Sequence, residues 1–387
     1  MKRSIIAIAA SAAMAASILG ANPAQAGGRH DDRDEPRVRP VSYDSTTIAS
    51  NLFTPLSLAV DDRGSSYVSQ NFAGELLRIA PDGTRTTLAT VPGQEVGGVS
   101  VRGRTVYLTT TGQDPATPSA ALWKIKRDGT LQQLADLRAY EETQNPDAGT
   151  TYGFVDLPAA CAAQFPADFP ATYTGLVDAH PYATLPTRRG AVYVADAAAN
   201  AILKVSKRGT VSTVAVLPPT ETVEVTAEAA TAQGLPACVA GFDYRFEFVP
   251  TDVEQGPDGS LYVTSLPGGP EDASLGARGA VHKVSPWSGR ARKVAGGFVG
   301  AVNLAVGPRG EIAVAELFGG DEGTGQVTIL KPGSSRRSVL PLAAPGAVEW
   351  TDGRRGALYA TTSAFVPGPD GAPQAIGELV RIRLGRH

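Results

Sequence analysis

The sequence predicts an all-β fold, a six-bladed β-propeller of four-stranded antiparallel blades whose ring is closed by an N-terminal strand. The first observation is a repeat, because six times a polar turn containing Gly leads into an apolar strand. The second is that five of these six strands carry Tyr at the equivalent place, and the third is the absence of long helical stripes. The six turn-and-strand units span 62–68, 102–108, 189–194, 258–263, 309–314 and 355–360.

The spacing of the repeats fits propeller blades. The equivalent positions 67, 107, 193, 262, 313 and 359 are separated by 40, 86, 69, 51 and 46 residues. The shortest interval matches a four-stranded blade of ~40–50 residues. The two long intervals contain insertions, about 141–174 and 219–247, with aromatic residues at Tyr244, Phe246 and Phe248. Loops of this length in a compact domain are usually functional.

The last repeat supplies only three strands, at 348–350, 357–361 and 379–384. A blade cannot bury both faces alone, so blades must pack around an axis until the ring closes. We expect the missing outer strand to come from residues 46–50, because this pairing removes two open sheet edges.

The N-terminus is typical of a secretory signal. Lys2 and Arg3 precede an apolar stretch, and small residues end at Ala26, so residues 1–26 read as a signal peptide cleaved after Ala26. The apolar stretch is shorter than the ~20 residues of a membrane span. Residues 27–41 lack apolar periodicity and are expected to be a disordered linker, followed by the propeller domain at 42–387. The mature protein is therefore expected to be secreted and extracellular, without a membrane span.

The two cysteines, Cys161 and Cys238, fall in the two insertions. In an oxidising compartment a pair of cysteines usually forms a bridge. We expect one disulfide that ties the insertions together, and two independent thiols are the alternative.

Composition and motifs exclude several function classes. The formal net charge is −3 and the basic residues are scattered, so no nucleic-acid partner is expected. The sequence lacks the Gly-x-Ser-x-Gly surroundings of a hydrolase serine. It also lacks paired Cys and His at zinc-ligand spacing and a Gly-rich phosphate loop.

The segment 192–205, with Val-Tyr-Val-Ala-Asp followed by an Asn-led strand, resembles an NHL-type repeat. Two further segments, Asp-Ala-His-Pro-Tyr at 178–182 and 248–263, are similar to the ScyD/ScyE family of secreted six-bladed propellers. The resemblance covers about residues 42–384 and implies export and a propeller, but no settled activity. His180 departs from the family pattern, which more often has Asn before Pro-Tyr.

Residues just before the innermost strand of each blade converge on one mouth of the central channel, where propellers form ligand sites. The converging positions are Pro55, Gly97, Pro181 with its neighbours, Thr251, Asp252, Asn303 and Ala347. The candidate ligand-binding residues are Asp178, His180, Tyr182, Thr251, Asp252, Asn303 and Glu316. His180 and Asp252 are the candidate catalytic residues, because a His can act as a general acid or base near neutral pH.

Asp252 and Asn303 offer hard oxygen ligands of the kind that calcium or magnesium prefers. The pair is similar to part of the metal site of gluconolactonase and senescence-marker propellers, whose resemblance implies one Glu, two Asn and one Asp as ligands. Pro55 and Leu56 stand where that family's Glu would lie, so only two of the ligand types have counterparts. The alternative is that Asp252 and Asn303 cap backbone groups at the channel mouth.

Other polar residues have structural explanations. Asp196 and Asn200 are expected to bond backbone amides in a turn. Glu316 precedes an acidic loop that is expected to be solvated, and His282 is expected at the surface or between blades.

These observations give two hypotheses. The first is a monomeric exported binding scaffold that recognises a small molecule, a glycan or a cell-envelope protein at the channel mouth and the insertions. The alternative is a calcium- or magnesium-dependent lactonase-like hydrolase or lyase with its site in the central channel.

Overall fold

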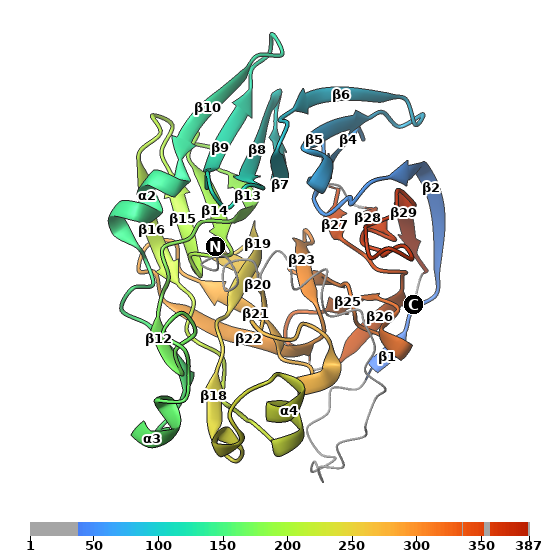
Figure 1. Ribbon diagram of the computed structural model, residues 1–387. Coiled ribbons are helices and arrows are strands. Elements are labelled where there is room, and N and C mark those ends of the chain that lie inside the picture. Colours follow the sequence, from blue (N-terminus) through green and yellow to red (C-terminus); the bar gives the residue numbers. More distant parts are fainter. Residues whose placement is uncertain (1–37, 335, 352–356, 386–387) are drawn as a thin grey trace.

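The computed structural model describes residues 38–334, 336–351 and 357–385. The signal peptide, residues 27–37 of the linker and part of the sixth turn lie outside the described residues. Within them the chain is nearly all β, with seven sheets and only short helices (Figure 1). The expected all-β architecture of four-stranded antiparallel sheets is confirmed.

Six of the sheets follow one another along the chain. Sheet 1 contains β3 (Leu58–Val60), β4 (Ser66–Gln70), β5 (Glu75–Ile79) and β6 (Arg85–Thr90). Sheet 2 contains β7 (Gln94–Arg102), β8 (Thr105–Gly112), β9 (Ala120–Ile125) and β10 (Leu131–Asp136). Sheet 3 contains β13 (Pro181–Pro186), β14 (Val192–Asp196), β15 (Ala201–Val205) and β16 (Val211–Val216).

Sheet 4 contains β19 (Val249–Gln255), β20 (Leu261–Leu266), β21 (Gly279–Val284) and β22 (Ala291–Phe298). Sheet 5 contains β23 (Ala301–Val306), β24 (Ile312–Glu316), β25 (Gln326–Leu330) and β26 (Arg337–Pro341), with β1 (Val38–Pro40) at its edge. Sheet 6 contains β27 (Ala347–Trp350), β28 (Leu358–Thr362), β29 (Gly377–Leu384) and β2 (Tyr43–Leu52).

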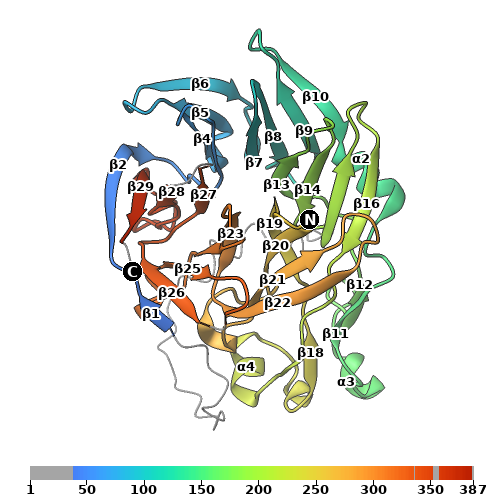
Figure 2. The same ribbon diagram turned by 180° about the vertical axis from the view of Figure 1, so that it is seen from behind.

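The first strands of these sheets lie toward the centre of the molecule (Figures 1 and 2). Each contacts the first strand of the next sheet, in the order β3, β7, β13, β19, β23 and β27, and β27 contacts β3. The starts of the first strands therefore face one common end of the molecule, which we call the mouth.

Burial changes from the centre outward. Every residue of β4, β14, β24 and β28, the second strands of their sheets, is buried. Neighbouring sheets cover both faces of these strands, which explains why they carry only apolar residues and small or hydrogen-bonding polar residues without Lys or Arg. The outer strands β6 and β10 have only one buried residue each and carry polar residues.

The outer edge of sheet 6 is formed by the N-terminal strand β2, which pairs antiparallel with β29. Ala49 and Leu52 of β2 are buried against Leu58, Ile79 and Leu379. The expected pairing of residues 46–50 with the last repeat is present, and it covers the open edge of β29.

The expectation of disorder was wrong for the end of the linker. Residues 38–40 form β1, which pairs in parallel with β26. The amide of Val41 donates to the carbonyl oxygen of Val339 at 3.0 Å, and the side chain of Val41 is buried. The backbone groups of residues 38–41 are hydrogen-bonded by the outer edge of sheet 5. This edge is a tertiary feature, so the composition of the segment could not predict the pairing.

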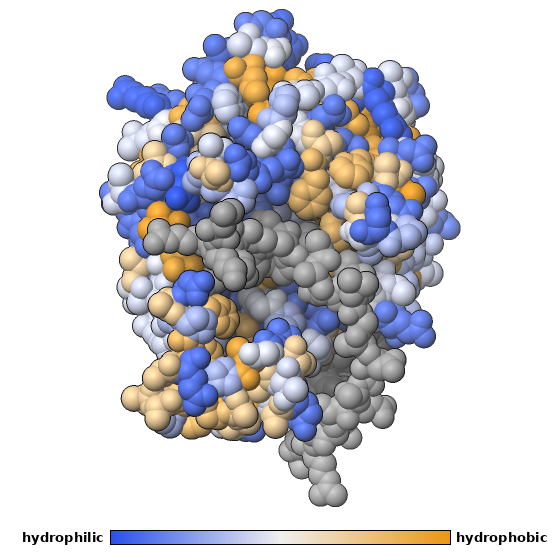
Figure 3. Space-filling model, in the orientation of Figure 1, coloured by the Kyte–Doolittle hydropathy of each residue, from blue (hydrophilic) through white to orange (hydrophobic). Residues whose placement is uncertain are grey.

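The two insertions build a seventh sheet together. Its strands are β12 (Thr172–Thr174), β11 (Thr151–Phe154), β18 (Asp243–Arg245) and β17 (Val223–Glu224), in this order. The expected disulfide is confirmed, and it joins Cys161 to Cys238 with a Cα–Cα distance of 5.9 Å. Tyr244 packs edge-on against Phe154 and lies 4.5 Å from the ring centroid of Phe246. Mildly apolar residues gather where α3, β18 and α4 lie at the lower end of the face in Figure 3.

The helices are short connectors. They are α2 (Leu137–Gln144), α3 (Ala159–Ala162), α4 (Ala227–Ala232) and the 3₁₀ turns η1 (Asn71–Ala73), η2 (Ala237–Val239), η3 (Ala273–Leu275) and η4 (Asp321–Gly323). Asp136 caps α2 by accepting from the amide of Ala139. In the described part of the chain no helix has the length and apolarity to cross a membrane.

Candidate functional site

Irregular strand starts shape the mouth. The registers of β7, β13, β19 and β23 with their partners each shift near the start of the strand. A bulge leaves a residue outside the ladder and re-aims the neighbouring side chains. These shifts place Tyr182, Thr251 and Val302 between the regular pairs of their strands.

Glycines allow the first strands of sheets 2 and 3 to approach closely. A Cβ atom on Gly98 would lie 2.5 Å from Cα of Ala183, and one on Gly97 would lie 2.7 Å from the carbonyl oxygen of Pro181. A side chain at either position would push β13 away. The expected place of Gly97 at the mouth is therefore a point of backbone contact.

His180 lies buried between sheets 2 and 3. Its Nε2 is 3.1 Å from Oε2 of Glu95, which lies near the start of β7, and its amide donates to Oδ1 of Asp196 at 2.7 Å. Burial alone would lower the pKa of His180, but the charge and hydrogen bond of Glu95, with the charges of Asp196 and Asp178, raise it overall. The Glu95 carboxylate therefore stabilises the protonated form of the buried imidazole relative to the neutral form.

Two buried polar groups lie near this pair without a bonding partner in the described part of the chain. They are the hydroxyl of Tyr182 and Oε2 of Glu271 in the loop between β20 and β21. Burial and the charges of Glu95, Glu271 and Asp252 raise the pKa of Tyr182, so its hydroxyl stays protonated. Burial raises the pKa of Glu271 to about 8. Unpartnered buried polar atoms are costly unless a ligand or water satisfies them.

Asp252 and Asn303 were expected just before their first strands. The structure places them inside β19 and β23, near the start of each strand, and brings them together. Nδ2 of Asn303 donates to Oδ2 of Asp252 at 2.6 Å, and the amide of Leu304 donates to the same oxygen at 3.0 Å. Oδ1 of Asp252 accepts from the amide of Val253, and Oδ1 of Asn303 accepts from the amide of Val348. The two side chains thus link sheets 4, 5 and 6.

The hydrogen bonds of Asp252 and Asn303 occupy the oxygen atoms that a metal ion would need. Every side-chain oxygen of Asp252 and Asn303 already accepts a backbone or amide hydrogen bond, which favours the capping role. Burial raises the pKa of Asp252 to about 7 in spite of its hydrogen bonds with Leu304, Val253 and Asn303. The described residues contain no group of three or more His, Cys, Asp or Glu arranged to hold a metal ion.

The hydroxyl of Thr251 also links neighbouring sheets, because it donates to the carbonyl oxygen of Ala301 at 2.8 Å. The same kind of link recurs between sheets 2 and 3, where Thr109 donates to the carbonyl oxygen of Pro181 at 2.6 Å. Thr251 therefore has a structural partner at the mouth.

The remaining candidates have structural partners of their own. Asp178 forms an ion pair with Arg138 at 3.3 Å and caps the amide of Ala179. Glu316 is buried rather than part of a solvated loop, and it accepts from the amide of Val299 and from Gln326 and Thr328. His282 is completely buried and packs edge-on against Phe248, so the expectation of a surface position was wrong.

Asp196 and Asn200 belong to a buried polar cluster that adjoins His180. Asp196 accepts from the amides of His180 and Ala199, as a turn residue does, while Nδ2 of Asn200 donates to Asp147 at 2.8 Å. Glu141 of α2 is 1% exposed, and neither of its carboxylate oxygens has a bonding partner in the described part of the chain. Burial and the charges of Asp196 and Asp147 raise its pKa to about 8.

The sequence analysis missed Glu95, Glu271 and Glu141. Glu95 stands two residues before the Gly97–Gly98 pair. A charged residue so close to the start of a first strand could have indicated that Glu95 belongs to the mouth. Glu271 lies in an irregular loop and Glu141 in a helix of an insertion, where the repeat gives no register.

No protein-family model matches the chain, and a comparison with curated proteins finds no match either. Solved structures match over most of its length. An aldose sugar dehydrogenase from Streptomyces coelicolor, solved with PQQ bound, is 13% identical with a TM-score of 0.53, over 89% of this chain and 99% of its own. A Bacteroides thetaiotaomicron protein of unknown function is 11% identical with a TM-score of 0.54, over 89% and 76%.

A gluconolactonase from Xanthomonas campestris is 11% identical with a TM-score of 0.49, over 89% of this chain and 90% of its own. At these identities the similarity concerns the fold alone. The chain shares the β-propeller architecture of its structural neighbours.

Proposed function

We propose that the chain is an exported, monomeric six-bladed β-propeller of the ScyD/ScyE type, closed by β2, which binds a small polar molecule at the mouth. The contacts that run from β3 through β27 and back to β3 support six blades in a closed ring. The N-terminal charge and apolar pattern supports export after cleavage at Ala26.

A single observation carries the binding proposal. The His180–Glu95 pair lies beside the unpartnered hydroxyl of Tyr182 and the unpartnered oxygen of Glu271. A ligand with hydroxyl or carbonyl groups would satisfy these atoms, and binding sites typically combine a few such polar groups with apolar walls. Phe72 of η1 is partly exposed at the same end, where it packs edge-on against the buried Phe365 at 6.2 Å, and it can supply apolar surface.

Thermal melting of the mature protein with D-glucose, D-gluconate and D-glucono-1,5-lactone tests this proposal. We expect at least one compound to raise the Tm of wild type, and Tyr182→Phe to lose most of the shift. Tyr193→Phe is the matched control, because Tyr193 lies at the far end of sheet 3 and should keep the shift. A compound that stabilises both variants equally, or no stabilising compound, would contradict the proposal.

A hydrolase or lyase acting at the same mouth is the second candidate function. The favouring observation is that Glu95 orients His180 and raises its pKa, as a general acid or base requires. A general acid or base contributes about 10²–10⁴ in rate.

A panel of lactones and esters, assayed with calcium, with magnesium and with EDTA, tests the second candidate. We expect His180→Ala to lower turnover by that factor at a temperature where the variant is still folded, because loss of the buried pair also lowers stability. Loss of turnover in EDTA and in Asp252→Asn would support a metal at Asp252 and Asn303. No turnover by wild type under any of these conditions would contradict catalysis without touching the binding proposal.

A further inference from the structure

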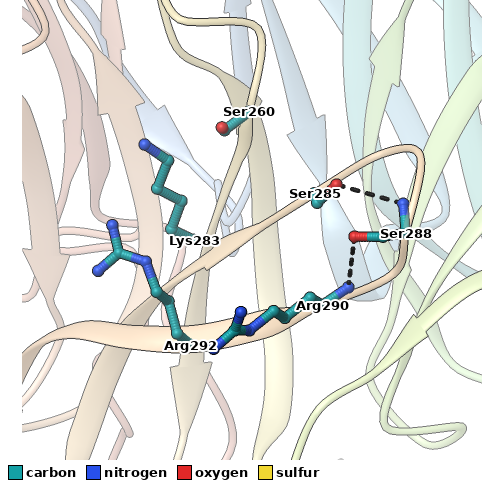
Figure 4. Close-up of a pocket in the computed structure, with 6 residues that line it drawn as sticks. All are labelled: Ser260, Lys283, Ser285, Ser288, Arg290 and Arg292. Atoms are coloured by element: carbon teal, nitrogen blue, oxygen red, sulfur yellow. Dashed lines mark hydrogen bonds between the residues drawn. The ribbon is translucent and has the colours of Figure 1, made fainter.

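A shallow pocket of about 310 Å³ lies on sheet 4, at the end of its strands remote from the mouth (Figure 4). Its lining is basic and rich in hydroxyl groups. The lining residues are Ser260, Lys283, Ser285, Ser288, Arg290 and Arg292. Figure 4 shows the Lys283 and Arg292 side chains extending from neighbouring strands.

In sheet 4 two cations face each other on neighbouring strands, and the corresponding pairs in the other sheets contain no such second cation. A cation recurs on the third strand of five sheets, and in four of them its partner on the outer strand is uncharged. The pairs are Arg78–Thr86, Lys124–Gln132, Lys204–Ser212 and Arg381–Thr46. In sheet 4 the partner of Lys283 is Arg292. Like charges directly opposite each other destabilise a sheet, so this pair has a cost that the other sheets avoid.

The turn beside this pair also departs from the repeat. In sheets 1, 2 and 3 the turn between the third and fourth strands ends at a threonine, which is Thr84, Thr130 or Thr210. The carbonyl oxygen of this threonine accepts a hydrogen bond from the amide of the residue four positions earlier. In sheet 4 the amide of Ser285 donates to the carbonyl oxygen of Arg290, so the turn is one residue longer and ends in Arg. The longer turn carries Trp287.

Trp287 is 83% exposed, which is unusual for so large an apolar side chain. Its ring lies beside the pocket, because a Cβ atom on Gly259 would be 3.6 Å from Cη2 of Trp287 and Gly259 adjoins Ser260. An exposed indole next to cations offers a flat apolar surface at the edge of a charged site.

The arginines are available for a ligand. Lys283 forms an ion pair with Asp258. The guanidinium groups of Arg290 and Arg292 make no hydrogen bond or ion pair with another residue in the described part of the chain. Ser285 and Ser288 organise the turn, since Ser285 Oγ accepts from the amide of Ser288 and Ser288 Oγ from the amide of Arg290, at 3.2 and 3.5 Å (Figure 4).

We propose that this pocket binds an acidic polysaccharide, with a uronate carboxylate at Arg290 and Arg292 and an adjoining sugar ring on Trp287. A guanidinium matches a carboxylate with two parallel hydrogen bonds. The C–H face of a sugar ring packs on an indole, and the serine hydroxyls suit sugar hydroxyls. A nucleic acid fits less well, because the chain is acidic, Asp258 borders the pocket and only one exposed aromatic side chain is present there.

Titration calorimetry with a galacturonate octasaccharide at low salt tests this proposal, with its fully methyl-esterified form as the uncharged counterpart. We expect wild type to bind the acid form at least tenfold more tightly than the ester. Arg290→Thr/Arg292→Thr, which places at both positions the uncharged kind of residue found in the other sheets, should weaken binding at least tenfold. Trp287→Ala should weaken it and abolish the ligand-induced change in tryptophan fluorescence.

Arg127→Thr/Arg208→Thr is the matched control, because it removes two exposed arginines from the equivalent turns of sheets 2 and 3. This control should bind like wild type. The proposal is overturned if wild type does not bind the acid form, if the ester binds equally well, or if the control loses as much affinity. Tighter binding of an oligothymidylate through the same arginines would identify the pocket as a nucleic-acid site instead.

A second readout separates binding from folding. Arg292→Thr removes the like-charge pair with Lys283, so its Tm should equal or exceed that of wild type while its affinity falls. A lower Tm accompanied by the lower affinity would assign Arg292 to the fold.

Discussion

At the scale of single residues, the hydrogen bonds of the mouth separate structural from ligand-facing groups. Asp252, Asn303 and Thr251 have their oxygens engaged between sheets, whereas the Tyr182 hydroxyl and one oxygen of Glu271 have no bonding partner in the described part of the chain. Buried polar atoms without partners cost about 1–3 kcal/mol each. The groups that the fold leaves unsatisfied are therefore the ones with most to gain from a ligand.

The His180–Glu95 pair should make stability depend on pH. The fold raises the pKa of His180 above 6.5, so the stabilisation by protonated His180 is complete below pH 6.5 and is lost as the pH rises through the folded-state value. Glu95→Gln should cost about 1.5–3 kcal/mol at pH 5.5 and less at pH 9. Urea unfolding of both proteins at the two pH values measures this difference. An equal cost at both would show that the pair acts without a charge on His180.

Glu141 is an acid and His180 is a base, but the fold raises the pKa of both. The free energy of unfolding should therefore fall with rising pH at Glu141, as it does at His180. Its pKa is raised from 4.5 to about 8, so the fold favours the neutral acid. Stability should therefore fall as the pH rises from 4.5 to 8, by on the order of 3 kcal/mol. Glu141→Gln should remove this part of the loss between pH 5 and pH 9 in urea unfolding. Glu142→Gln, on the same helix with its side chain 52% exposed, is the control and should retain the wild-type loss.

At the scale of elements, the N-terminal strand has the largest predicted effect. Removing residues 42–52 in addition to the preceding chain exposes the edge of β29 and the cluster around Ala49 and Leu52. Each fully buried aliphatic side chain is worth about 1.5–3 kcal/mol. Melting curves of proteins that begin at residues 38, 42 and 53 should show a small loss for the second and a large one for the third. Equal Tm values for all three would argue against closure by β2.

The disulfide should stabilise the insertion sheet. Cys161 and Cys238 are 77 residues apart, and the chain-entropy relation gives about 4.5 kcal/mol for a loop of this size. In Cys161→Ser/Cys238→Ser we expect faster proteolysis within 141–174 and 219–247, with sheets 1 to 6 still protected. Limited proteolysis with mass spectrometry of the fragments measures this. Cleavage spread evenly over all sheets would show that the bridge supports the entire fold.

The repeat made most strands predictable, because they follow a local periodicity. The pairing of β2 followed from a last repeat with only three strands, and the disulfide followed from the presence of two cysteines. The mouth was only partly predictable. A one-residue bulge decides whether Tyr182 or its neighbour leaves the ladder, and no repeat encodes that shift. Glu95 and His180 are 85 residues apart in sequence, so their contact depends on sheets 2 and 3 being neighbours. The insertion sheet pairs strands of two to four residues, too short for a clear period.

At the scale of the whole molecule, the mouth and the pocket on sheet 4 lie at opposite ends of the same strands. Between them β20 is bonded to β19 and, along most of its length, to β21, and five of its six residues are buried. Coupling between two sites requires an element with two arrangements that both sites influence. Apart from the bulge at Thr251, the ladder between β19 and β20 keeps one register, so we expect that binding at one end does not alter binding at the other.

This independence can be measured. His180→Ala should leave the affinity for the galacturonate octasaccharide within about twofold of wild type, since effects of distant sites are additive to within ~0.3–0.5 kcal/mol. Arg290→Thr/Arg292→Thr should likewise leave unchanged the thermal shift that a mouth ligand produces. Because linkage is reciprocal, a real coupling would change both affinities by the same factor. A change of fivefold or more in both directions would therefore contradict a rigid scaffold and point to a movement of sheet 4, whereas a change in only one would indicate that the variant had disturbed its neighbour's fold.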